Sequence, residues 1–166
     1  MRILQRLLDG SEALLVAACV ASFVVMFVLG VATVVFRFVL DSSLAFPDEL
    51  IRYLFVWMIA LGSAVTYRRN AHAAIGALVD RLPDLWRKAA LLIATGAGLV
   101  FFVIVLVYGA QITVRVWPQI SPALEVSMSW VYAAAPAGMA FLTIYAVELL
   151  LRQLFAPAAT LREDGQ

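Results

Sequence analysis

The chain has 166 residues, of which 64% are hydrophobic and 14% are charged, and its formal net charge is +1. A soluble domain is about half apolar and a quarter charged, so this composition argues against a water-soluble protein. The near-neutral charge argues against nucleic-acid binding, and the single cysteine, Cys19, excludes an intrachain disulfide or a multi-cysteine metal site. The charged residues interrupt long neutral runs, which is typical of an all-α membrane protein with several spans.

The first neutral run extends from Ala13 to Phe36 and predicts a membrane span at about 12–37. Arg2 and Arg6 precede it, as in a secretory signal peptide. The apolar part is longer than the usual h-region of about 7–15 residues, however, and no small-x-small cleavage site closes it. We therefore expect a helix that is retained in the mature protein.

The second predicted span, at about 47–69, has the sequence PDELIRYLFVWMIALGSAVTYRR. After Arg52 only Tyr53–Tyr67 is uncharged. Such a stretch covers roughly 22 Å at about 1.5 Å per residue, which is short of the ~30 Å hydrocarbon core. The helix therefore spans a membrane only if Arg52 lies near the interface, snorkels to it or is paired.

The segment that follows predicts a short amphipathic helix in the membrane interface at about 72–82. Its apolar residues recur at helical spacing, and they are Ile75, Leu78, Val79 and Leu82. Pro83 ends this helix, and Trp86 is expected to anchor a third span at about 86–114. We interpret His72 as an interfacial polar residue, because one histidine makes a poor metal site.

A loop with two prolines and two tryptophans, WPQISPALEVSMSW, precedes a fourth span at about 127–151. We expect this loop to rest on the headgroup layer or partly re-enter it. Residues 1–155 then form one transmembrane domain, and the tail at 156–166 is expected to be disordered.

Small residues are expected to let the spans approach each other closely in lipid. The positions that we assign to helix packing are Ala90, Ala94 and Gly98 in the third span, Gly62 in the second, and Pro136 and Gly138 in the fourth. Pro136 is also expected to kink its helix.

Lysine and arginine residues predict the orientation, because cytoplasmic segments carry their excess. One side of the membrane holds Arg2, Arg6, Arg68, Arg69, Arg81, Arg87, Lys88, Arg152 and Arg162, and the other side holds Arg37, Arg52 and Arg115. Both termini are therefore predicted to be cytoplasmic. Arg68 and Arg69 are expected to cap the negative end of the second span and to anchor its orientation.

The span centres lack the residues that membrane chemistry needs. A transmembrane haem usually needs two histidines and a thiol oxidoreductase needs a cysteine pair, and the chain has one of each residue. No catalytic residue, metal ligand or cofactor is predicted, and the chain is not expected to be an enzyme. Glu148 and Arg152 are spaced to form an ion pair at a helix end.

Asp48, Glu49 and Arg52 admit two accounts, which the sequence leaves open. In the first, the acids stabilise the positive end of a helix that starts near Pro47, and one helix face holds an acid–Arg pair. In the second, the group contacts another protein. Trp57, Trp117, Glu125 and Trp130 are further candidates for such contacts, although interfacial anchoring explains the loop tryptophans equally well.

Two separated segments resemble the small membrane subunit of TRAP (tripartite ATP-independent periplasmic) transporters. The first segment matches that pattern at Glu49, Arg52, Trp57, Gly62, Arg68, His72, Leu82 and Pro83, and the second at Ser121, Pro122, Leu124, Trp130, Tyr132, Pro136 and Gly138. Ser127 departs from an expected proline, and Ala73 and Ala74 from bulkier residues. The resemblance covers roughly residues 9 to 152.

The resemblance implies a non-catalytic scaffold subunit in the inner membrane of a bacterium. Its partners would be membrane lipids, a large multi-span TRAP subunit that moves an organic acid with a sodium gradient, and a periplasmic substrate-binding protein. The alternative is a self-contained small transporter or channel that acts as a homo-oligomer. Uptake by the chain alone discriminates between the two.

Overall fold

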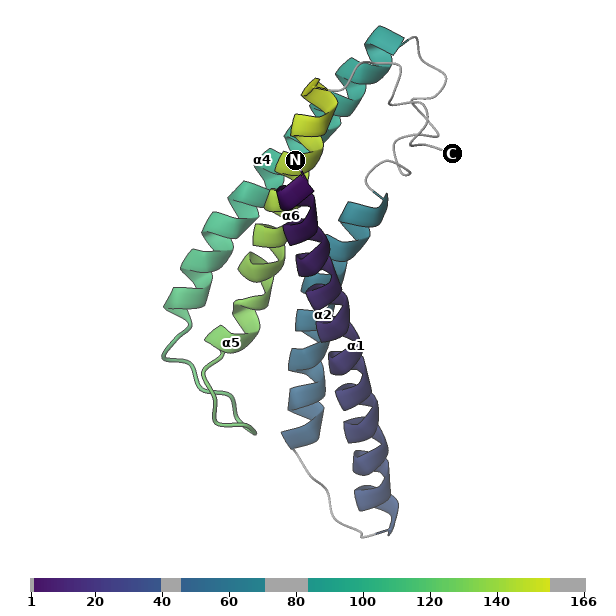
Figure 1. Cartoon of the computed structure of the whole chain (residues 1–166). Helices are drawn as coiled ribbons and strands as arrows, with labels where there is room; N and C mark the ends of the chain where they lie inside the picture. The colour runs from purple at the N-terminus through teal and green to yellow at the C-terminus, as the bar shows by residue number, and fades with distance from the viewer. Residues whose placement is uncertain (1, 40–45, 71–83, 156–166) are drawn as a thin grey trace.

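The computed structural model describes residues 2–39, 46–70 and 84–155. Its helices are α1 (Arg2–Val39), α2 (Phe46–Asn70), α4 (Asp84–Arg115), α5 (Ser129–Tyr132) and α6 (Ala134–Phe155) (Figure 1). Over these ranges the only extended pairing is an isolated bridge between Ile120 and Ser127. The predicted all-α fold is confirmed.

Four helical stretches are long and apolar enough to cross a membrane, as the sequence predicted. They are Leu8–Val39, Phe46–Arg69, Trp86–Arg115 and Ser129–Leu154. Helix α1 begins at Arg2, ahead of the membrane span predicted at about 12–37, and its 38 residues make it longer than a bilayer core requires. The interfacial helix predicted at 72–82, with His72, and the tail at 156–166 lie outside the described residues.

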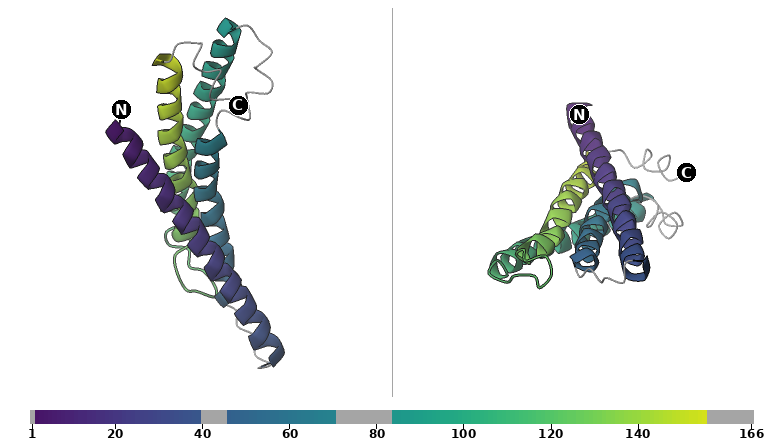
Figure 2. Two further views of the ribbon diagram at one scale, coloured as in Figure 1. Left: turned by 45° about the vertical axis from the view of Figure 1, so that its right-hand side comes forward. Right: turned by 90° about the horizontal axis from the view of Figure 1, so that it is seen from below.

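Helix α6 occupies a central position, because it packs against both α4 and α2, while α1 packs mainly against α2. Figure 2 shows α1 lying obliquely across the other helices, with the N-terminus on the α6 side. The order of neighbours is therefore α1, α2, α6, α4. The two outermost helices in this order, α1 and α4, each leave a wide face that the other described helices do not cover.

The buried core is small and lies at one end of α2. It consists of Leu8, Leu15, Ala64, Val65, Leu142 and Tyr145. Large apolar side chains elsewhere are exposed, including Phe27 at 65% and Ile93 at 71%. A water-soluble protein does not leave contiguous apolar faces of this extent uncovered, so lipid or other protein must cover them.

The last span is interrupted at Ala133, between α5 and α6. Proline has no amide hydrogen, and its ring crowds the carbonyl of the preceding turn, so Pro136 accounts for the break. Pro136 also packs against α4, because a Cβ atom built on Gly109 would lie 3.4 Å from its Cδ atom. The interruption thus occurs where α6 meets α4.

Helices α2 and α6 approach closely at Gly138, where the sequence predicts helix packing. A Cβ atom on Gly138 would lie 2.6 Å from the Ala60 carbonyl oxygen, so only glycine fits. Gly62, on the other side of α2, faces α1, and a Cβ atom there would meet the Cys19 sulfur at an ordinary 3.8 Å.

Unlike Gly138 and Gly62, the small residues predicted for packing in α4 do not face a neighbouring helix closely. Leu91 and Thr95 are the buried positions of this stretch, whereas Ala94 is exposed. Ala90 is half-buried, and a Cβ atom on Gly98 would contact only Phe102 of the same helix. The stripe formed by Ala90, Ala94 and Gly98 is therefore not what joins α4 to α6.

Candidate functional site

Helix α2 carries polar contacts at both of its ends, and the two sets face different parts of the chain. At the start of the helix, Glu49, Tyr53 and Trp57 follow one another at four-residue intervals and so share one face. We call these three residues the loop-facing stripe. They contact the α4–α5 loop, residues 116–128, and the short helix α5.

Glu49 forms the first contact of the stripe. Its Oε2 atom accepts hydrogen bonds from the backbone amides of Ala123 and Leu124, both at 2.9 Å. The Tyr53 hydroxyl donates a hydrogen bond to the other carboxylate oxygen. Glu49 was a candidate for contact with a partner protein, but three donors of the same chain already meet its carboxylate.

Tyr53 and Trp57 continue the stripe toward the middle of α2. The Tyr53 hydroxyl lies 3.3 Å from the Met128 sulfur, at the end of the loop. The Trp57 indole nitrogen donates a 2.9 Å hydrogen bond to the Trp130 carbonyl of α5. Successive stripe residues therefore meet successive parts of the loop and α5.

Asp48 and Arg52 lie outside this arrangement. Both side chains are exposed, and no ion pair joins Arg52 to Asp48 or Glu49, all of which are among the described residues. The acid–Arg pair that the sequence spacing allowed is therefore absent. For Glu49 the reason is that its carboxylate turns toward the loop amides, which offer it two hydrogen bonds in fixed positions.

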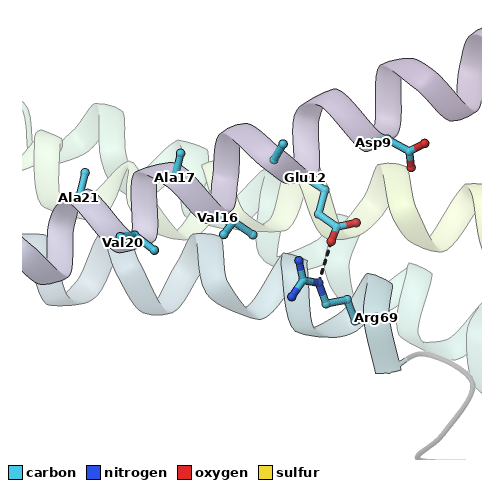
Figure 3. A pocket seen from close by; sticks show the side chains of 8 residues that line it. Asp9, Glu12, Val16, Ala17, Val20, Ala21 and Arg69 are labelled. Carbon is cyan, nitrogen blue, oxygen red and sulfur yellow. Dashed lines mark hydrogen bonds and ion pairs between the residues drawn. The ribbon is translucent and has the colours of Figure 1, made fainter.

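At the other end of α2, Arg68 and Arg69 bind the acids of α1. The Arg68 guanidinium donates to Asp9 at 2.5 Å, to Glu12 at 2.9 Å and to the Leu8 carbonyl at 2.5 Å. Arg69 donates to the other oxygen of Glu12 at 2.7 Å, as Figure 3 shows. We call this group of two arginines and two acids the α1–α2 clamp.

The clamp also reaches α6. The Arg68 guanidinium carbon lies 5.4 Å from the centre of the Tyr145 ring, a cation–π distance. The Tyr145 hydroxyl, which is buried, lies 3.0 Å from the Ser11 hydroxyl of α1. Arg68 therefore joins three helices. The pairing of Glu148 with Arg152, predicted from their spacing, is present at 2.6 Å.

Sequence reasoning assigned Arg68 and Arg69 to helix capping and did not identify Asp9 or Glu12. A signal for these acids was present, because they lie three residues apart on one helix face next to an apolar run. It was not used because nothing in a single sequence shows that this face meets the end of α2.

A shallow apolar groove adjoins the clamp on α1 (Figure 3). It is lined by Asp9, Glu12, Ala13, Val16, Ala17, Val20, Ala21 and Arg69. The polar lining residues are engaged in the clamp, and the remainder is aliphatic. Over the described residues no cluster of His, Cys, Asp and Glu could hold a metal ion. Apart from the clamp residues, the groove therefore offers aliphatic packing surface.

The other sequence-predicted candidates are dispersed. Trp117 and Glu125 are exposed on the α4–α5 loop, and Glu125 has a positive φ of 55°. Trp130 is exposed on α5, although its backbone carbonyl meets Trp57. Trp86 is exposed near the opposite end of α4. The structure thus brings together Glu49, Trp57 and Trp130 and leaves the others apart.

Residues 26–156 match the family described as tripartite ATP-independent periplasmic transporters, DctQ component. This match covers most of the chain and includes the loop-facing stripe, the α4–α5 loop and α6. The chain belongs to the DctQ family. It is therefore a small permease component of a TRAP transporter and a multi-pass membrane protein.

Named relatives of this DctQ-family chain agree with that assignment. It is 30% identical over 162 residues to the C4-dicarboxylate TRAP transporter small permease protein DctQ of Rhodobacter capsulatus, covering 80% of this chain and 71% of the relative. It is 25% identical over 148 residues to the sialic acid TRAP transporter small permease protein SiaQ of Vibrio cholerae, covering 89% of this chain and 84% of the relative.

A third relative differs in size from this DctQ-family chain. The sialic acid TRAP transporter permease protein SiaT of Haemophilus influenzae is 28% identical over 118 residues. The alignment covers 69% of this chain but only 18% of SiaT. A segment like the small permease therefore occurs there within a much longer permease protein.

Proposed function

We propose that this protein is the non-catalytic scaffold subunit of a sodium-coupled secondary transporter that imports organic acids. It would act with a large membrane subunit and a periplasmic substrate-binding protein. The observation that carries the proposal is the DctQ family match over residues 26–156, in a chain whose span centres hold no ionisable transport site.

The absence of charge within the spans supports a scaffold over a pump. No Asp, Glu, Lys, Arg or His occurs in Ala13–Phe36, Tyr53–Tyr67, Ala89–Val114 or Val126–Val147. Ion and proton pathways in membrane proteins are marked by such residues at mid-depth. A subunit that only supports another needs apolar helices and packing faces, which is what these spans supply.

The exposed faces of α1 and α4 support the existence of a larger membrane partner. SiaT joins a small-permease-like segment to a long additional sequence, which fits a small unit that works beside a larger one. We infer that the large subunit covers part of the surface that carries Phe27 and Ile93, while lipid covers the rest.

The distribution of lysine and arginine supports an inner-membrane orientation with both termini in the cytoplasm. In this orientation the α1–α2 clamp lies at the cytoplasmic end, and Glu49 and the α4–α5 loop lie at the periplasmic end. The loop would then be available to a soluble periplasmic protein.

Co-expression and reconstitution test the proposal. The tagged chain should co-purify with a large multi-span TRAP subunit of the same organism. Proteoliposomes that contain both subunits and the binding protein should take up labelled organic acid in a sodium-dependent manner, with succinate and sialic acid as the first probes. Uptake by the chain alone would support the alternative, a self-contained homo-oligomeric transporter or channel.

A further inference from the structure

The α4–α5 loop has little apolar packing to hold it in place. Ser121 is buried, but Trp117 and Ile120 are 64% and 69% exposed. A segment with few buried apolar contacts has low local stability unless polar contacts order it. Val116, Ala123, Leu124 and Met128 are only half-buried, so the conformation of the loop depends in large part on its hydrogen bonds.

Backbone hydrogen bonds join the two sides of the loop, but at its tip two amides bond to an acceptor outside the loop. Ser121 N donates to Val126 O at 2.9 Å, and Met128 N donates to Gln119 O at 2.8 Å. At the tip, the amide of Ala123 meets Glu49, and the amide of Leu124 is shared between Glu49 at 2.9 Å and the Ser121 hydroxyl at 3.2 Å. The acceptor for the amides at the tip of the loop therefore comes from helix α2.

The Glu49 carboxylate is suited to this position for two reasons. A charged acceptor forms stronger hydrogen bonds than a neutral one, and one oxygen here accepts two amides at once. The Tyr53 hydroxyl, one turn further along α2, donates to the second oxygen and so fixes the carboxylate rotamer. Asp48, the adjacent acid, is exposed and takes no part.

We propose that Glu49 is a positioning residue, which holds the α4–α5 loop in the conformation that the periplasmic binding protein recognises. The inference rests on the proposed function, since it assumes that the loop faces that protein. Glu49 acts through the loop backbone and does not itself contact the binding protein. Loss of its carboxylate frees the tip amides and lets the loop sample other conformations.

The order of the loop is measured first, on the full-length chain in lipid nanodiscs. A nitroxide on I120C, in a C19S background, reports loop mobility by electron paramagnetic resonance. We expect E49A to convert the restricted spectrum to a mobile one, E49Q to lie between E49A and the parent, and D48A to match the parent. E49Q retains one carbonyl oxygen as an acceptor but loses the charge, whereas D48A removes a neighbouring charge without touching the loop.

Docking is measured second, on the complex with the large subunit in nanodiscs and the purified binding protein. E49A should raise the Kd roughly tenfold, as expected for the loss of a charged hydrogen-bond acceptor. D48A should leave the Kd unchanged, and E49Q should restore part of the affinity. The yield of assembled complex should be the same for all variants, which separates positioning from a general role in folding.

Three results would overturn the inference: an E49A loop as immobile as the parent, a mobile loop with an unchanged Kd, or a loss of complex assembly that E49Q shares. If E49A alone fails to assemble, E49Q carries the test and must still weaken docking. If the parent complex does not bind the binding protein, the proposed function is contradicted. The effect of E49A on loop mobility is still tested in that case, because it is measured on the chain alone.

Discussion

The Ala60 carbonyl of α2 and the Cα atom of Gly138 in α6 are so close that a Cβ atom at position 138 would lie 2.6 Å from the carbonyl oxygen. This contact sets the separation of the two central helices. It involves a main-chain atom on the α2 side, so no side-chain rotation can relieve a larger residue.

Gly138→Ala should force α2 and α6 apart and destabilise the chain by about 1–3 kcal/mol, the usual cost of overpacking. Gly96→Ala is the matched control, because a Cβ atom there meets nothing within 4 Å. Alanine favours a helix by about 1 kcal/mol over glycine, so this control should be neutral or stabilising. Melting temperatures in nanodiscs measure the stability of both variants. Equal changes in the two variants would show that the close approach at Gly138 does not determine stability.

Arg68→Ala should detach α1 from α2 at the clamp. It removes the Arg68 hydrogen bonds to Asp9, to one oxygen of Glu12 and to the Leu8 carbonyl, at a cost of about 1–3 kcal/mol for charged hydrogen bonds. Arg69→Ala removes one ion pair of a side chain that is 60% exposed, so it should cost less than about 1 kcal/mol. Thermal unfolding with a distance probe between α1 and α2 tests the ranking. Comparable losses in the two variants would mean that charge, and not the geometry of Arg68, holds α1.

Trp57→Phe should loosen α5 while leaving the spans in place. The substitution keeps an aromatic ring but removes the indole N–H that bonds to the Trp130 carbonyl, at a cost of about 0.5–1.5 kcal/mol. Hydrogen exchange of residues 129–132 should therefore become faster. Trp117→Phe serves as the control, since the Trp117 side chain is exposed on the loop. The prediction fails if exchange in α5 is unchanged by Trp57→Phe.

Ala94→Leu tests the small-residue stripe of α4 as a surface for the large subunit. Ala94 is exposed within the chain, so a larger side chain should change the stability of the isolated protein by less than about 0.5 kcal/mol. If the large subunit packs closely on this stripe, the same variant should reduce co-purification of the complex. Ala97→Leu, at another exposed position of α4, is the matched control. If the Ala94→Leu variant assembles normally with the large subunit, the stripe faces lipid and not the large subunit.

The fold class and the four spans could be predicted from the amino-acid sequence alone. Each span is visible as a local run of apolar residues, because a helix needs about 20 of them to cross the bilayer core, whatever helices lie beside it. The family resemblance also rested on local motifs, and the match over residues 26–156 confirms it. The spacing of Glu148 and Arg152 was sufficient to predict their ion pair for the same reason, since both lie on one helix.

Which groups meet between helices depends on how the helices pack in three dimensions. Glu49 had Arg52 within reach on its own helix, yet it bonds to loop amides more than 70 positions away in the chain, since Ala123 and Leu124 follow it by 74 and 75 residues. Likewise, Gly138 mattered for packing whereas Ala94 did not contribute to the α4–α6 contact. Small residues let helices approach from any side, so the rotation and order of the helices select the face that is used.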